Sequence, residues 1–297
     1  MSFDGLAISL RGLEKRYPGF ALGPVDLAIE PGTVVGLVGP NGAGKTTTLN
    51  CIGGLVAPDA GTVEIYGRPN RPDDTTWKHD VGYVGEEHGF YGRWTAEKNL
   101  RVIGGLHRTW SDQRVRRMIE RFELPPATRA MDLSKGNRTK LALIAALGHS
   151  PRLLLLDEPT SGLDPLVRNE VLDVLWEILE DGEAAILYST HVLSDISRLA
   201  DELVFLRQGQ NLLRSEKEAL SESWRRISFR LDADAATLAG TVDHKRVGIE
   251  HQVISSDQES TLQQLNELGA ENIEESRMTI DEIAVEILRG KDHVESR

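Results

Sequence analysis

The sequence predicts an α/β fold in which helices flank a mostly parallel β-sheet. Three largely apolar runs have the length of strands, Val34–Gly39, Leu153–Leu156 and Ala184–Thr190. Such runs, unlike segments that alternate apolar and polar residues, are typical of strands covered on both faces. Helical patterns separate the runs, and this alternation of strand and helix predicts a parallel sheet with helices on its faces.

The composition narrows the class of protein. With 297 residues and 40% apolar residues, the chain has room for one large and one small domain. Its net charge of -12 argues against nucleic-acid binding, because phosphate contacts need concentrated Lys and Arg. A single cysteine, Cys51, excludes an internal disulfide and fits a reducing compartment. With no secretory leader expected and no apolar run near the ~20 residues that span a bilayer, we expect a soluble intracellular protein without direct membrane insertion.

The first third of the chain contains mainly strand and turn patterns. We expect residues 6–66 to form an N-terminal antiparallel β subdomain that leads into one helix. That helix is predicted from about Lys45 to Leu55, directly after the first apolar run. The strand-like segment TVEIYG follows it.

The middle of the chain is helical. Between Thr95 and Leu147 we expect an inserted helical subdomain, covering about residues 90–150. Ser111 is a predicted N-cap, and the apolar residues after it recur at helical spacing. Those residues are Val115, Met118, Ile119 and Phe122. Ser134 stands in the same position before a second helix, in the segment MDLSKGNRTKLALIAAL.

The last third contains one more helix of the large domain and then a change in composition. Pro165 is predicted to begin the helix, because the missing N–H of proline costs nothing at the first helical position. Gly182 is expected to end it. Segments such as MTIDEIAVEIL then suggest a small α+β unit. We therefore predict a large domain over residues 1–215 and a small accessory domain over residues 216–297.

The segment GPNGAGKTT matches the pattern G-x-x-x-x-G-K-[ST] between a predicted strand and a predicted helix. Its glycines let successive backbone N–H groups surround phosphate oxygens, next to the partial positive charge of a helix N-terminus. Lys45 would contact the β- and γ-phosphates, and the Thr46 hydroxyl would bind Mg²⁺. The sequence thus predicts a nucleoside triphosphate site on a P-loop NTPase core. Its residues are Gly39, Pro40, Asn41, Gly42, Ala43, Gly44, Lys45, Thr46 and Thr47.

Three further polar residues follow the ends of predicted core strands, where ligands bind in such sheets. Asp157 comes directly after the leucine run and would hold Mg²⁺. Glu158 would polarise the attacking water as general base, which typically contributes roughly 10²–10⁴ in rate. His191 follows the next strand. There it either forms a structural hydrogen bond or, as we favour, contacts the γ-phosphate.

The order of four motifs resembles the nucleotide-binding subunit of ABC transporters: GPNGAGKTT, LSKGN, LLLLDEPTSGLDP and STH. The likeness covers residues 6 to about 210. It implies an ATPase in which two such domains pair head to tail around ATP and Mg²⁺. Each phosphate loop then faces the partner's LSGGQ-type segment, so that Ser134 and Gly136 would contact the γ-phosphate held by the partner.

The resemblance implies two further roles. Tyr17 would stack on adenine, by analogy with aromatic stacking on nucleic-acid bases. The alternative for Tyr17 is a half-buried tyrosine at the end of a strand. Asp164 would be the loop aspartate that couples the two sites across the dimer.

The sequence departs from the family pattern in two places. Glu86 stands where a glutamine usually lies near Mg²⁺, and we expect its carboxylate to bind the metal; Glu87 is the alternative for that position. In the LSGGQ-type segment, Lys135 replaces a glycine and Asn137 replaces the glutamine. We include both replacements in the predicted nucleotide-binding segment. Lys135 either adds a cation near the partner's nucleotide or faces solvent.

The predicted function is that of an ATPase that energises a separate multi-span membrane permease. Two segments, DEPTSGLDP and MTIDEIAVEILRGK near the end of the chain, resemble those in the ATP-binding subunits of drug, peptide or lipid exporters. Alternatives are a ribosome-associated or DNA-repair ATPase and an ATP-sensing module. We expect the protein to form a homodimer, or a heterodimer with a similar subunit. We also expect it to be cytoplasmic and bound peripherally to the inner face of the cell membrane. An aromatic cluster is formed by Phe90, Tyr91 and Trp94. It either binds a cytoplasmic helix of the permease or packs only against neighbouring residues of this chain.

Overall fold

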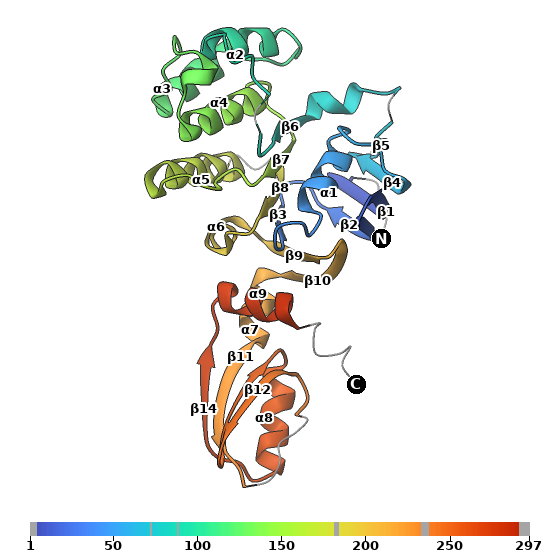
Figure 1. Ribbon diagram of the computed structural model, residues 1–297, viewed down its shortest axis with the longest axis vertical. Coiled ribbons are helices and arrows are strands. Elements are labelled where there is room, and N and C mark those ends of the chain that lie inside the picture. Colours follow the sequence, from blue (N-terminus) through green and yellow to red (C-terminus); the bar gives the residue numbers. More distant parts are fainter. Residues whose placement is uncertain (1–4, 72, 88, 181–183, 233–237, 291–297) are drawn as a thin grey trace. The chain divides into compact units, whose positions relative to one another are not determined.

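The computed structural model describes residues 5–71, 73–87, 89–180, 184–232 and 238–290. These residues form two compact units (Figure 1). The larger unit runs to Ala200 and includes Leu206–Asn211, and the smaller comprises Asp201–Phe205 and the residues from Leu212 onward. The boundary thus passes through two consecutive strands, β9 (Glu202–Arg207) and β10 (Gln210–Glu216).

The larger unit begins with a four-stranded antiparallel sheet in the order β2-β1-β4-β5. This confirms the predicted antiparallel β subdomain. Strands β1 and β2 form a tight hairpin in which Tyr17 is the partner of Phe20. The strands are β1 (Ile8–Tyr17), β2 (Phe20–Ile29), β4 (Ala60–Ile65) and β5 (Arg68–Pro69).

The second sheet has six strands in the order β10-β9-β3-β8-β7-β6. Its central neighbours β3, β8, β7 and β6 pair in parallel. Every residue of β3, β7 and β8 is buried, which explains why these segments are apolar without alternation. The predicted parallel sheet is therefore confirmed. Its remaining strands are β3 (Val34–Val38), β6 (Val81–Val84), β7 (Leu153–Asp157) and β8 (Ala185–Thr190).

Helices α2, α3 and α4 group at one end of the larger unit as the predicted helical subdomain (Figure 1). The predicted N-caps are confirmed, because the Ser111 hydroxyl accepts from the Arg114 amide and the Ser134 hydroxyl from the Asn137 amide. The helices of this unit are α1 (Lys45–Ile52), α2 (Ala96–Gly104), α3 (Asp112–Arg121), α4 (Lys135–Leu147), α5 (Pro165–Glu180) and α6 (Leu193–Leu199), with short 3-10 turns η1 (Thr76–Asp80) and η2 (Ala130–Asp132).

The predicted C-terminal end of α1 is wrong, and that of α5 lies outside the described residues. The expected extension of α1 to Leu55 is wrong, because Gly54 has φ of +64° and turns the chain out of the helix. Helix α5 begins at Pro165 as predicted. Gly182, expected to end it, lies outside the described residues.

The smaller unit is an α+β structure, as predicted. Its four-stranded antiparallel sheet has the order β12-β13-β11-β14. Buried Ile227, Phe229 and Val253 of the sheet form a core with Leu265 of a helix. The elements are α7 (Lys217–Ser223), β11 (Arg225–Arg230), β12 (Thr241–Val247), β13 (Glu250–Ser255), α8 (Gln258–Glu267), β14 (Glu271–Arg277) and α9 (Ile280–Arg289).

The turn between β9 and β10 connects the phosphate loop to the N-terminal hairpin. The Gly209 amide donates to the Ala43 carbonyl at 3.0 Å, and the Gly209 carbonyl accepts from the Gly23 amide at 2.7 Å. A Cβ atom on Gly209 would be 1.9 Å from the Ala21 carbonyl oxygen, so only glycine fits this close approach.

We expect Gly209→Ala to destabilise the protein more than Gly19→Ala does. Both glycines have similar positive φ, +80° and +82°, so an alanine costs about 1–2 kcal/mol of backbone strain at either position. Only at Gly209 does the added methyl group also overlap a backbone oxygen. Urea unfolding followed by tryptophan fluorescence measures both losses. Equal losses would contradict this role of Gly209.

Candidate nucleotide site

The phosphate loop connects buried strand β3 to helix α1. Gly42 and Gly44 have φ of +79° and +107°, which side chains disfavour. The Lys45 side chain is 5% exposed and turns back over the loop. Its ammonium donates to the Gly39 carbonyl at 2.8 Å and to the Pro40 carbonyl at 3.3 Å. The loop thus holds a buried cation beside a helix N-terminus, as an anion site requires.

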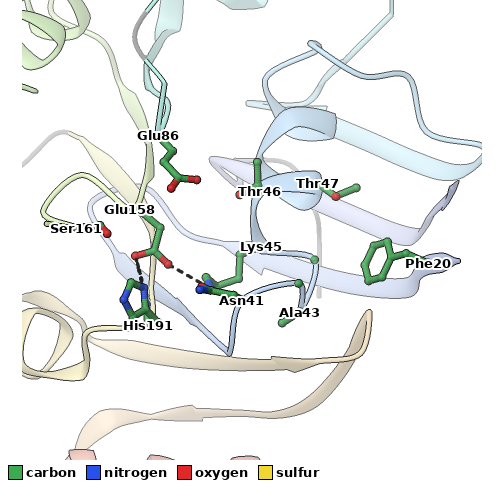
Figure 2. A pocket seen from close by; sticks show the side chains of 12 residues that line it. Phe20, Asn41, Ala43, Lys45, Thr46, Thr47, Glu86, Glu158, Ser161 and His191 are labelled. Atoms are coloured by element: carbon green, nitrogen blue, oxygen red, sulfur yellow. Dashed lines mark hydrogen bonds and ion pairs between the residues drawn. The ribbon is translucent and has the colours of Figure 1, made fainter. Parts of the chain in front are cut away.

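A cavity of about 530 Å³ opens beside this loop (Figure 2). Five segments contribute to its walls: the start of β2, the phosphate loop with α1, the segment after β6, the loop after β7 and the loop after β8. This is the carboxyl edge of the parallel strands. The lining comprises Phe20, Asn41, Gly42, Ala43, Gly44, Lys45, Thr46, Thr47, Glu86, Glu158, Ser161 and His191.

Glu158 lies between Lys45 and His191 in this cavity, and Figure 2 shows both contacts. One carboxylate oxygen of Glu158 is 3.2 Å from the Lys45 ammonium, and the other is 2.8 Å from His191 Nδ1. Glu158 has φ of +50°, a costly conformation for a non-glycine residue. Its amide donates to the Ser189 carbonyl at 3.1 Å, which fixes the turn that directs the carboxylate into the cavity.

Asp157, one residue earlier, is only 1% exposed. Its Oδ1 accepts from the Ser189 hydroxyl at 2.6 Å. Its Oδ2 is buried and has no hydrogen-bond partner among the described residues. A buried carboxylate oxygen without a donor fits a cation, and a carboxylate together with the Thr46 hydroxyl is a suitable ligand set for Mg²⁺. These residues could therefore hold the metal of a bound nucleotide.

The cavity brings together most of the predicted site. Phosphate-loop residues Asn41 to Thr47 line it, with Glu86, Glu158 and His191. Glu87 instead lines a separate groove with Phe90. The structure therefore favours Glu86 over Glu87 for the position near the phosphates.

Phe20 and Ser161 line the cavity but were missed by sequence reasoning. The Phe20 ring packs against the phosphate loop, since a Cβ on Gly44 would lie 3.2 Å from its Cζ. Tyr17, predicted to stack on adenine, is 41% exposed at the end of β1 and is absent from the described lining. Stacking by Tyr17 stays a prediction. The tight hairpin that pairs the two aromatic residues was the available signal for Phe20.

The LSKGN segment and Asp164 lie outside the lining of this cavity. Ser134 is exposed at the start of α4. Asp164 Oδ1 accepts from the amides of Leu166 and Val167, so it caps α5. The chain therefore presents these residues on surface away from its own phosphate loop.

Within that segment, the chain packs closely at two points. The exposed Lys135 extends to the loop before α5, since a Cβ on Gly162 would lie 2.7 Å from its ammonium. A Cβ on Gly136 would lie 3.1 Å from Val167, which explains the glycine there. Asn137 is half-buried and its amide donates to the Ser134 hydroxyl at 3.2 Å.

The aromatic cluster forms one compact surface. The rings of Tyr91 and Trp94 stack with centroids 4.2 Å apart, and Tyr91 is 64% exposed. The Lys98 ammonium lies 4.4 Å from the centre of the Trp94 ring. Local packing thus accounts for Trp94, while Tyr91 is available to a partner.

Comparison with known proteins identifies the family. The family model described as ABC transporter matches residues 22–161. The ABC transporter ATP-binding protein NatA of Bacillus subtilis is 34% identical, over 73% of this chain and 90% of that protein. The chain belongs to the ABC transporter ATP-binding proteins. These subunits form a family of ATPases, and the P-loop NTPase core that the sequence predicts is their fold.

Two further relatives carry names that mention multidrug transport or Nod factor export. The probable multidrug ABC transporter ATP-binding protein YbhF of Escherichia coli is 36% identical over 75% of this chain. The chain spans only 39% of the length of that protein. Nod factor export ATP-binding protein I of Rhizobium leguminosarum is 33% identical, over 74% of this chain and 73% of that protein.

Solved structures have the same fold. An ATP binding subunit of an ABC transporter superposes with a TM-score of 0.66 and 29% identity, covering 73% of this chain and 92% of that one. A bacterial ABC transporter cassette in dimeric form gives a TM-score of 0.64 at 27% identity, covering 70% and 98%. Across the described part of this ABC protein, no helix combines the length and hydropathy needed to span a membrane.

We expect Cys51 of α1 to be unreactive while the protein is folded. Burial raises the pKa of its thiol from 9.0 to about 11, so only about one molecule in a thousand carries the thiolate at pH 8. Labelling with a thiol-specific disulfide reagent should be at least about a hundredfold slower in buffer than in urea. The folded-state rate should rise with pH toward 11. Equal rates with and without urea would contradict this assignment.

Proposed function

We propose that this ABC protein hydrolyses MgATP to ADP and phosphate as the energising subunit of an export transporter. The observation that carries the proposal is the position of Glu158, whose carboxylate contacts both Lys45 and His191 at the edge of a cavity formed by the phosphate loop. An acid, a cation and an imidazole at one anion site are the groups that hydrolysis of a γ-phosphate needs.

Each of these groups has a distinct task. The Lys45 ammonium binds the β- and γ-phosphate oxygens and leaves Glu158 as these oxygens replace it. The Glu158 carboxylate then accepts the proton of a water molecule that attacks the γ-phosphorus. His191, held by Glu158 through Nδ1, presents its other ring nitrogen to the γ-phosphate. Thr46 and Asp157 would hold Mg²⁺, which would neutralise phosphate charge.

A second copy of the chain would complete the site. Ser134 begins α4 on exposed surface, where the helix N-terminus contributes about half a positive charge. We propose that Ser134 and Gly136 contact the γ-phosphate held by the partner, with Asp164 close to the dimer axis. Closure around two ATP molecules and reopening after hydrolysis is then a rigid-body switch driven by a ligand. The dimeric cassette among the structural relatives supports this arrangement.

The partner in the membrane is proposed to be a multi-span permease. Its cytoplasmic helix would enter the groove of about 530 Å³ that Glu87 and Phe90 line together with Trp77 and Ile103. The exposed Tyr91 lies next to Phe90 in the chain. The relatives named for multidrug transport and for Nod factor export support an exporter, which we place on the inner face of the cell membrane. Residues 216–297 would act as an accessory domain.

We expect Glu158→Gln to reduce ATP hydrolysis by roughly 10²–10⁴, because the amide cannot accept the proton of water. ATP binding should remain, since Lys45 and the phosphate loop are unchanged. Size-exclusion chromatography of this variant with saturating MgATP should give a dimer that wild-type protein forms only transiently. A monomer under these conditions would contradict the closing dimer, and full activity would exclude Glu158 as the base.

We expect Ser189→Ala to act through Asp157. The lost hydrogen bond to Oδ1 is worth about 1.5–3 kcal/mol because its acceptor is charged, so hydrolysis should fall by roughly tenfold or more. The concentration of Mg²⁺ needed for half-maximal activity should rise, because Asp157 is no longer oriented. Titration of Mg²⁺ at fixed ATP measures this shift. An unchanged Mg²⁺ requirement would separate Ser189 from metal binding.

A further inference from the structure

A concave surface rich in arginine lies away from the nucleotide cavity. It has a volume of about 550 Å³ and lies between α3, the segment before β7, and α5. We call it the arginine groove, defined by Arg114, Arg117 and Arg121 of α3, by Arg152, and by the apolar residues between them. The arginines on α3 recur at intervals of three and four residues and so follow one helix face.

The floor of the arginine groove is apolar. Leu147, Val174 and Ala184 are 5%, 6% and 5% exposed, and Met118 and Ile178 are half-buried beside them. These side chains come from α3, α4, α5 and the residue before β8. Because the first three are already buried, an apolar molecule on this floor would remove from water mainly the surface of Met118 and Ile178, at about 25 cal/mol per Å².

The rim of the groove carries positive charge that the described part of the chain does not neutralise. Arg121 pairs with Glu177 at 3.1 Å. Arg114 instead donates to the Ser150 hydroxyl, and the Arg152 guanidinium lies 3.8 Å from the centre of the Tyr66 ring.

Arg117 has no ion pair or hydrogen bond to any described residue, and it is exposed. Arg114, Arg117 and Arg152 thus have no described carboxylate partner, although the protein as a whole has a net charge of -12. An unpaired guanidinium is a strong donor for carboxylate, sulfonate or phosphate.

We propose that the arginine groove binds a small amphipathic anion, with its apolar body on the floor and its acidic group against Arg117. The volume lies within the range of small-molecule sites, and the cationic rim selects an anion. The described linings of this groove and of the nucleotide cavity have no residue in common. The anion and MgATP would therefore contact different described residues.

The position of the groove connects it to the same strands that carry the nucleotide site. Arg152 directly precedes β7 and Ala184 directly precedes β8. Glu158 and His191 directly follow the other ends of these two strands. The groove is thus at the amino edge of the sheet, opposite the edge at which nucleotide binds.

The experiment uses the full-length protein and 8-anilinonaphthalene-1-sulfonate, an apolar aromatic body with one sulfonate. Fluorescence titration gives its affinity for the wild type, for Arg117→Gln and for Arg116→Gln. Arg116 is the matched control, because it is the neighbouring exposed arginine but lines a different surface of α3. Arg117→Gln should weaken binding about tenfold, as expected for one charged hydrogen bond, and Arg116→Gln less than twofold.

Competition assigns the bound probe to the groove. Sodium dodecanoate should displace the sulfonate probe, and neutral dodecanol should require at least about ten times the concentration, since it lacks the anion. Saturating MgATP should leave the affinity unchanged. Equal losses in both arginine variants, equal displacement by acid and alcohol, or displacement by MgATP would each overturn the proposal.

Discussion

The parallel pairing of β3, β8 and β7 is the constraint on which the site depends. Val38 at the end of β3 pairs with Thr190, and Ser189 pairs with Asp157. Because the carboxyl ends of the three strands lie side by side, the loops that follow them begin next to one another. Lys45, Glu158 and His191 thereby meet, although more than 100 residues separate the first from the second. Burial of the apolar strands on both faces holds this register, since slippage would expose them.

The backbone directly after β7 is held in a costly conformation. Glu158 has positive φ, and the Ser189 main chain and side chain both accept from its amide. Gly209 brings the turn after β9 against the phosphate loop and the N-terminal hairpin. A strained backbone conformation persists only where the surrounding contacts hold it in place. The site is thus preorganised by the buried sheet and by glycines that allow close backbone approach.

The anion-binding groups of the larger unit lie on separate surfaces. The phosphate loop and Glu158 line one cavity, and Ser134 lies on exposed surface outside it. Under the proposed function, a second subunit unites them, so that ATP itself forms much of the contact between copies. The arginine groove is a third surface, at the opposite edge of the sheet, where guanidinium groups lack described carboxylate partners. Electrostatics thus favours anions at each of these surfaces.

Local patterns in the sequence determined much of this protein. The apolar runs predicted the buried strands, Ser111 and Ser134 predicted helix starts, and the glycine-rich segment predicted the phosphate loop, because each depends on nearby residues alone. Only the tertiary structure decided that Phe20 lines the cavity, that Glu86 rather than Glu87 faces it, and that the arginines of α3 meet Arg152. These outcomes depend on packing between segments far apart in the chain, and no local pattern encodes such contacts.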